Sequence, residues 1–145
     1  MPSLGFDLLD RHVVHGRGED VACSDSTGTL SFARLLEQVA ALAGGLRAVG
    51  LGAGDEVEVR VAPDNLRVQV VCACIRLGAV SAERGDVRII EGAAGATVHT
   101  VDDEFDLSLV LRVGKTDPAP SLAYDQPGYR ERVSEAFGDV IEALS

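Results

Sequence analysis

The residues most suggestive of chemistry are Gly114-Lys115-Thr116, which have the composition of the end of a phosphate-binding loop. In such a loop, glycine amides surround the phosphates and a lysine reaches them. The full pattern requires a glycine five residues before Gly114, and this chain has Leu109 there. Lys115 is therefore expected to be an ordinary solvated loop residue, and a Walker-type nucleotide site is not predicted.

Histidine spacing does not predict a metal site. His12 and His15 are three residues apart in a predicted short helix over residues 7–15, so they could share one face. A metal site needs further ligands, and no third ligand accompanies them. Both histidines are expected to be exposed polar residues, and no metal site is predicted.

The three cysteines have spacings that suit neither a disulfide framework nor a metal site. Cys72 and Cys74 lie two apart in a helical pattern, which directs their side chains to different faces. With Cys23, they are predicted to be small core residues of a reduced cytosolic protein. No Gly-x-Ser-x-Gly elbow occurs, so no catalytic residue is predicted.

Composition favours one globular domain over residues 1–145. Hydrophobic residues make up 46% of the chain and charged residues 25%. The net charge is −10 with no basic cluster, so nucleic acid and anionic membrane surfaces are not expected partners. The N-terminus has neither a basic nor an apolar signal region, and a cytoplasmic location is expected.

Hydrophobic periodicity and capping residues predict the secondary structure. The two clearest elements are a helix over 31–49, capped by Ser31, and a helix over 64–77, capped by Asp64. The other predicted elements are a hairpin around Asp25-Ser-Thr-Gly28, strands at 55–61, 96–101 and 107–113, a helical stretch over 86–95, and an amphipathic terminal helix over 128–144.

Alternating strands and helices predict an α/β fold with a mainly parallel sheet flanked by helices. A parallel sheet buried on both faces normally has continuously apolar strands, and two of these strands do not. Burying unpaired charges is costly, so at least part of one face is expected to be solvated or to lie at an edge. The polar positions concerned are Glu56, Glu58, Arg60, Ser108 and Arg112.

Several segments between residues 7 and 103 carry a resemblance to a known family. They are Leu8-Leu-Asp-Arg-His, Thr29-Leu-Ser-Phe-Ala-Arg-Leu-Leu, Leu42-Ala-Gly-Gly-Leu-Arg-Ala-Val-Gly-Leu-Gly-Ala-Gly-Asp-Glu-Val57, Ala73-Cys-Ile-Arg-Leu-Gly-Ala-Val80 and Ile90-Glu-Gly-Ala-Ala-Gly-Ala-Thr-Val-His-Thr-Val-Asp. Their order and amino-acid sequences resemble the opening of the large domain of adenylate-forming enzymes. That superfamily includes acyl-CoA synthetases, nonribosomal peptide synthetase adenylation domains and luciferase.

The resemblance also identifies where the family's ATP phosphate loop would lie. It would follow residues 106–113, at Gly114, Lys115 and Thr116, where the family has a Ser/Thr/Gly-rich loop. This chain instead has a divergent loop over 114–127 with few glycines and several prolines, and Asp117 would repel phosphate. The chain also ends before the family's adenine, metal, ribose and catalytic-lysine motifs. The resemblance therefore implies the fold without the activity, and no cofactor is expected.

Three functions remain open at this point. The first is a non-catalytic remnant that acts as a binding or assembly protein, in lipid or secondary-metabolite biosynthesis. The second is the N-terminal subunit of a split acyl-CoA synthetase or adenylation enzyme. The third is a small-molecule binding protein. An exposed edge strand and inherited apolar surface predict a homodimer, or a complex with a biosynthetic partner protein.

Overall fold

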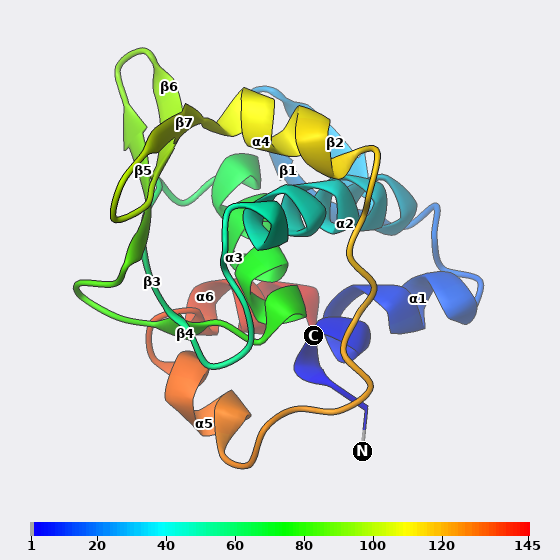
Figure 1. Ribbon diagram of the computed structural model, residues 1–145. Helices are drawn as coiled ribbons and strands as arrows, with labels where there is room; N and C mark the ends of the chain where they lie inside the picture. The colour runs from blue at the N-terminus through cyan, green and yellow to red at the C-terminus, as the bar shows by residue number, and fades with distance from the viewer. Residues whose placement is uncertain (1) are drawn as a thin grey trace.

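Two helices, α2 (Phe32–Ala48) and α3 (Asn65–Leu77), occupy the centre of the computed structural model, which describes residues 2–145 (Figure 1). Both were predicted, and their predicted caps are confirmed. Ser31 and Asp64 each accept a hydrogen bond from a backbone N–H of the first turn. Gly78 ends α3 in the left-handed conformation, with φ of 78°.

The N-terminal elements also follow the prediction. A π-helical turn, η1 (Phe6–Asp10), runs directly into α1 (Arg11–Val14). Strands β1 (Val21–Asp25) and β2 (Gly28–Ser31) then form an antiparallel hairpin of their own.

The main sheet has five strands in the order β4-β3-β5-β6-β7. Their bounds are β3 (Glu56–Arg60), β4 (Val80–Ser81), β5 (Val87–Gly92), β6 (Gly95–His99) and β7 (Glu104–Asp106). Strand β3 runs parallel to both β4 and β5, whereas the β5–β6 and β6–β7 pairs are antiparallel. The predicted α/β class with flanking helices is confirmed, and the sheet is mixed, with parallel pairing only around β3.

The helical stretch predicted over residues 86–95 is wrong, because this segment is β5 and its turn into β6. Val87 and Ile89 are buried while Arg88 is exposed, which is the two-residue period of a strand. Gly95 has φ of 120°, a value that allows the tight turn between the strands. Pairing on both sides of the segment fixes the extended conformation.

The strand predicted over residues 107–113 is also wrong, because these residues form helix α4 (Leu107–Gly114). Leu107, Val110 and Gly114 are buried at spacings of three and four, which is the helical period. The apolar run could satisfy either conformation locally. Helix α4 packs on α2, and this contact selects the helix.

The terminal amphipathic segment forms two short helices instead of the single predicted one. They are α5 (Tyr129–Ser134) and α6 (Gly138–Leu144), separated by an interruption that ends at Phe137. The predicted apolar stripe does pack on the core: Tyr129, Val133, Phe137, Val140 and Leu144 are all buried.

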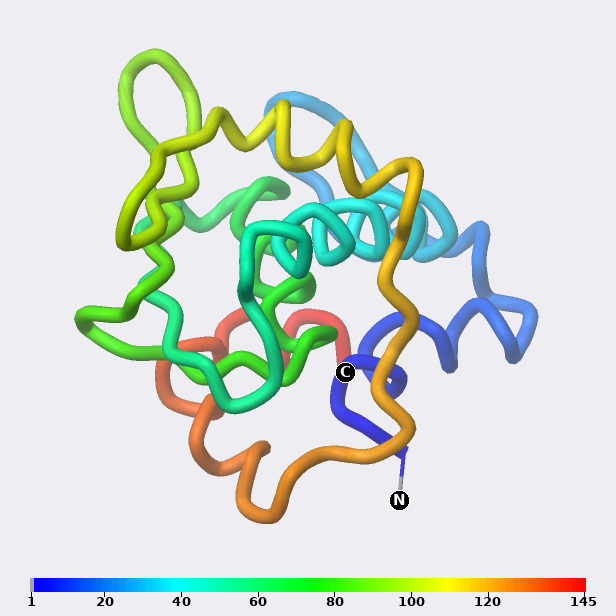
Figure 2. The backbone as a smooth tube through the Cα atoms, viewed as in Figure 1, coloured from blue at the N-terminus to red at the C-terminus, as the bar shows by residue number. Residues whose placement is uncertain are grey.

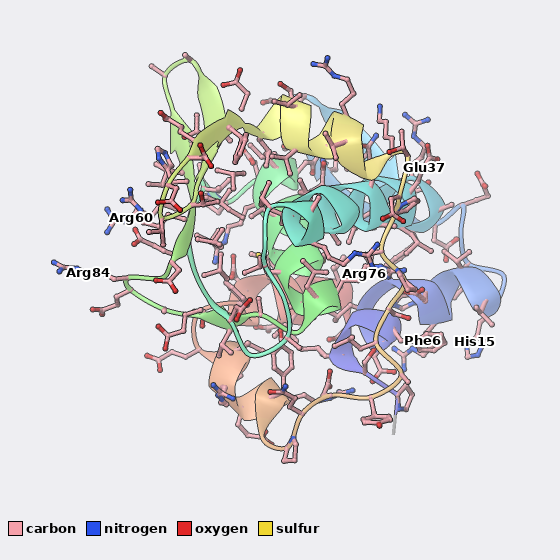
Figure 3. The ribbon with its side chains drawn as sticks, viewed as in Figure 1. Phe6, His15, Glu37, Arg60, Arg76 and Arg84 are labelled. Carbon is pink, nitrogen blue, oxygen red and sulfur yellow. The ribbon has the colours of Figure 1, made fainter. Side chains whose placement is uncertain are left out.

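The two faces of the main sheet differ in polarity. Figure 1 shows the helices gathered on one side of the sheet, and the inward side chains of Val57, Ile89 and Val98 are buried. On the other face, Arg60 points away from the molecule (Figure 3). The predicted solvated face is therefore present. Glu58 differs from that prediction because it is only 5% exposed, and it is paired with the Arg60 Nε at 2.5 Å.

The segment between α4 and α5 crosses the molecule from one end to the other (Figure 2). Hydrogen bonds hold it at several points, one of which is the Asp117 carbonyl, which accepts from Arg47 Nη2 at 3.4 Å. The Ala119 amide donates to the Ala40 carbonyl at 2.9 Å, and the Ala119 carbonyl accepts from the buried Arg76 Nε at 2.6 Å. Farther along, the Asp125 carboxylate accepts from the Leu4 amide at 2.9 Å. These bonds join the C-terminal part of the chain to the helices of the N-terminal part.

Candidate functional site

Gly114, the first residue of the predicted phosphate position, is buried in a backbone contact between helices. A Cβ atom at Gly114 would lie 1.5 Å from the carbonyl oxygen of Ala41 and 2.6 Å from the amide nitrogen of Gly45. Real side chains never approach backbone atoms this closely, so only glycine allows α4 to lie this near α2. The glycine therefore serves helix packing here.

Lys115 and Thr116 follow the last residue of α4, where the backbone has the wrong polarity for an anion. The amides of Lys115, Thr116 and Asp117 already donate to the carbonyls of Leu111, Val113 and Gly114, respectively. The Thr116 hydroxyl also donates to the Val113 carbonyl at 2.8 Å. A helix C-terminus carries partial negative charge from its free carbonyl groups. This position therefore offers a phosphate neither free amides nor a favourable dipole.

The two histidines are not brought together as ligands. His15 is exposed at the periphery, as predicted (Figure 3). His12, which was expected to be exposed, is buried: its Nε2 lies 3.1 Å from the Leu144 carbonyl oxygen and its ring packs on Phe32. The contact with α6 could not be foreseen because Leu144 is distant in sequence. Within residues 2–145, no group of three or more His, Cys, Asp or Glu side chains could hold a metal ion.

The cysteines are core residues, as predicted. Cys72 and Cys74 are buried in α3, and Cys23 packs partly buried against the same core. Burial raises the pKa of the Cys72 thiol and raises that of Cys74 to about 12. Because only a thiolate is a strong nucleophile, these buried thiols are chemically inert at neutral pH.

One cavity of about 420 Å³, here called the sheet-end cavity, lies where the parallel strands β3 and β4 end. Val59 and Ser81 line it, together with Arg67, Arg132 and Glu135. Arg67 is already occupied, since its Nε lies 2.8 Å from Asp139 and its Nη2 donates to the Ala136 carbonyl at 2.9 Å. The Arg67 charge therefore holds α6 in place.

A second cavity of about 420 Å³, here called the α4 cavity, lies between α2, α3, β6 and α4. Four leucines contribute to its walls, and its polar side chains are Gln69, Asp106 and Ser108. None of these polar residues was predicted to line a site, and Ser108 was predicted only as a polar position of a strand. The cavity could not be predicted from the sequence, because it forms only when residues 107–114 are helical and β5 and β6 form a hairpin.

Comparison with known proteins gives relatives over different parts of the chain. No protein-family model matches it. An acetyl-coenzyme A synthetase of Burkholderia mallei is 34% identical over 131 residues, covering 81% of this chain and 19% of the synthetase. An uncharacterised Pseudomonas aeruginosa protein, PA3568, is 45% identical over 78 residues, covering 50% of this chain and 12% of that protein. The chain is therefore similar to one segment of an adenylate-forming enzyme.

A solved structure shares the fold of about half of this chain. The N-terminal subdomain of NpsA from Klebsiella oxytoca matches with a TM-score of 0.50 and 23% identity, covering 56% of this chain and 20% of that one. The chain spans about a fifth or less of the length of these curated relatives. The match to the synthetase covers a larger share of the chain than residues 7–103, to which the sequence resemblance was assigned.

Proposed function

We propose that this adenylate-forming relative is a non-catalytic binding or assembly protein. The observation that supports this proposal best is the geometry at Gly114, Lys115 and Thr116. A phosphate loop needs free amides around a cradle, and here the amides are used within a helix end that is packed on α2. Lys115 alone, on the surface beside Asp117, is a weak substitute for such a cradle.

The test is calorimetry with Mg-ATP on the full chain. We expect a dissociation constant no tighter than about 1 mM, which corresponds to roughly −4 kcal/mol. Lys115→Ala is the matched variant, and it should leave the heat of titration unchanged. Micromolar ATP binding that is lost in Lys115→Ala would overturn the proposal, because it would show that the position still binds phosphate.

The outer face of α4 supports an assembly role. Leu109 and Val113 are one turn apart and are 41% and 47% exposed, respectively. Acidic residues precede the helix, including Asp106, whereas Arg112 and Lys115 lie at its other end. Two copies of α4 packed antiparallel would place the basic end of one beside the acidic end of the other. We therefore propose a homodimer through this face, with a biosynthetic partner protein as the other possible occupant.

Light scattering at micromolar concentration tests the dimer. Leu109→Asp and Arg112→Glu should each shift the mass toward the monomer, the first by charging the apolar contact and the second by placing acid against acid. Val14→Asp is the control, since Val14 is a highly exposed valine on another element. A monomeric wild type, or equal effects of all three changes, would contradict this interface.

A cytoplasmic location is part of the same proposal. All three cysteines are free thiols in the structure, which suits a reducing compartment. No helix within residues 2–145 is long and apolar enough to cross a membrane. Fractionation of the producing cell, with the chain expected in the cytosolic fraction, tests the location.

A second candidate is the opening segment of a two-chain adenylate-forming enzyme. The similarity to the Burkholderia mallei synthetase over 81% of the chain favours it. The test is to remove the matching segment from that synthetase and to add this chain in its place. Restored adenylation would support the two-chain enzyme, whereas binding without activity would support the non-catalytic role.

A further inference from the structure

We propose that the α4 cavity binds a small apolar molecule that carries a protonated amine, with Asp106 as its counter-ion. This site goes beyond the proposed function and depends neither on the dimer nor on the absence of ATP binding. The wall residues, the Asp106 carboxylate and the other hydrogen-bond acceptors beside it support this assignment.

The walls select an apolar ligand of limited size. Leu42 of α2, Leu66 of α3, and Leu107 and Leu111 of α4 line the cavity, and Ala96 of β6 closes one side. The volume of about 420 Å³ falls within the range of roughly 300–1,000 Å³ that is typical of small-molecule sites. Leu42 and Leu107 are already buried, so an alkyl or aryl body would remove from water mainly the partly exposed Leu66 and Leu111, which favours binding.

The Asp106 carboxylate is available to a ligand. Asp106 occupies the N-cap position of α4, where an aspartate side chain ordinarily accepts a hydrogen bond from the first turn. Here the side chain makes no such bond, and no ion pair to it is found within residues 2–145. The cavity lining contains no lysine or arginine. Asp106 is exposed at the rim of the cavity, and a carboxylate without a counter-charge there attracts a cation.

Two further side chains complete the acceptor set. Gln69 and Ser108 also line the cavity, and neither side chain makes a hydrogen bond among those found within residues 2–145. An ammonium group has three N–H donors and no acceptor. The three oxygen-bearing side chains of the lining match that number of donors. A carboxylate or phosphate ligand would instead meet Asp106 as a like charge, on a chain whose net charge is −10.

The sheet-end cavity has a similar volume but a different charge pattern. Two arginines and two glutamates line it, namely Arg67, Arg132, Glu83 and Glu135. The carboxylate of the α4 cavity, in contrast, has no basic residue in the same lining.

The experiment is a binding titration of the full chain with n-hexylamine, n-hexanol and n-hexanoate, followed by NMR of leucine methyl groups. We expect saturable shifts at Leu42, Leu66, Leu107 and Leu111 with hexylamine, at least about tenfold tighter than with hexanol, and no such shifts with hexanoate. This ratio equals about 1.4 kcal/mol of charge-dependent selectivity.

Asp106→Asn tests the counter-ion directly, because asparagine keeps the size and can still occupy an N-cap. The amine should then bind no better than hexanol. Asp103→Asn, which removes an equal charge nearby but outside the lining, should leave the amine affinity unchanged. Equal binding of the three probes, methyl shifts elsewhere, or unchanged amine preference in Asp106→Asn would overturn the proposal.

Discussion

Helix α4 and the α5–α6 pair are joined to the rest of the molecule in opposite ways. Helix α4 meets α2 through backbone: a Cβ at Gly114 would lie 1.5 Å from the Ala41 carbonyl oxygen, and one at Gly45 would lie 1.9 Å from that of Val110. Helices α5 and α6 instead insert large side chains, since Tyr129 and Phe137 are each only 2% exposed.

This difference determines which substitutions should weaken each contact. A backbone contact through glycine leaves no space for added atoms. A contact through aromatic rings concentrates the burial of apolar surface in a few residues, so removed atoms leave cavities. Substitutions that shrink a side chain should therefore affect α5 and α6 most, and substitutions that enlarge one should affect α4 most.

The largest expected effect is that of Phe137→Ala. Phe137 is buried between the sheet end and α6, so the substitution removes a whole ring from the core. We expect the free energy of unfolding to fall by about 3–5 kcal/mol. Urea unfolding measures it, with Tyr124→Ala as the control because Tyr124 is an exposed aromatic residue. A change below about 1 kcal/mol would mean that α6 is peripheral to the fold.

Gly114→Ala should have the next largest effect, through the added methyl group. To accommodate it, α4 must move away from α2, and overpacking of this kind costs typically about 1–3 kcal/mol. We expect the upper end of that range because the obstructing atoms belong to the backbone of α2. Gly138→Ala is the matched control, since nothing lies within 4 Å of a Cβ at Gly138. Equal stabilities of the two variants would refute a close α2–α4 contact.

The contrast between these regions also explains which parts of the fold were predictable. Helices α2 and α3 have local signals for both ends. Ser31 precedes α2 and Gly50 follows it, while Asp64 precedes α3 and Gly78 follows it. Their prediction therefore needed no tertiary information. The α4 segment has an apolar pattern that fits a strand or a helix, and only its packing on α2 decides. The sequence signal that could have revealed this packing is Gly44-Gly45, two glycines within a long helical pattern.

The candidate site was less predictable than the fold. The resemblance predicted that a phosphate position would lie at Gly114–Thr116, but it did not predict the helix-end geometry there, which depends on α4. The α4 cavity is walled by elements from four parts of the chain, among them Leu42 and Leu111. No local pattern records which apolar faces will leave a space between them, so the cavity could emerge only from the structure.

Tyr129→Phe separates two contributions to the α5 contact, because it removes one hydrogen bond and keeps the ring. The Tyr129 hydroxyl donates to the Ala79 carbonyl at 2.7 Å, and burial raises the pKa of this phenol, which keeps it protonated. Loss of the donor leaves a carbonyl oxygen unsatisfied in the core, at an expected cost of about 1–3 kcal/mol. Thermal or urea unfolding measures the cost, and Tyr124→Phe should be neutral. A neutral Tyr129→Phe would show that ring packing alone holds α5.

The smallest expected effect is that of Asp139→Asn, which tests the only ion pair found between α3 and α6 within residues 2–145. Arg67 contacts both carboxylate oxygens of Asp139, at 2.8 and 3.1 Å. These hydrogen bonds lower the pKa of Asp139 below its usual value of 3.8. Asp139 is 51% exposed on its side chain, so solvent screens the pair and its contribution is less than about 1 kcal/mol.

The pH dependence of this difference follows from the direction of the pKa shift. Because the folded-state pKa is lower than the unfolded one, the contribution of Asp139 is fully present above about pH 4 and is lost as the pH falls through the folded pKa. The stability difference between wild type and Asp139→Asn should therefore be constant near neutrality and should shrink on acidification. Denaturant unfolding at a series of pH values measures it. A difference that grows toward acid pH would show that the Arg67 pair does not stabilise the ionised carboxylate.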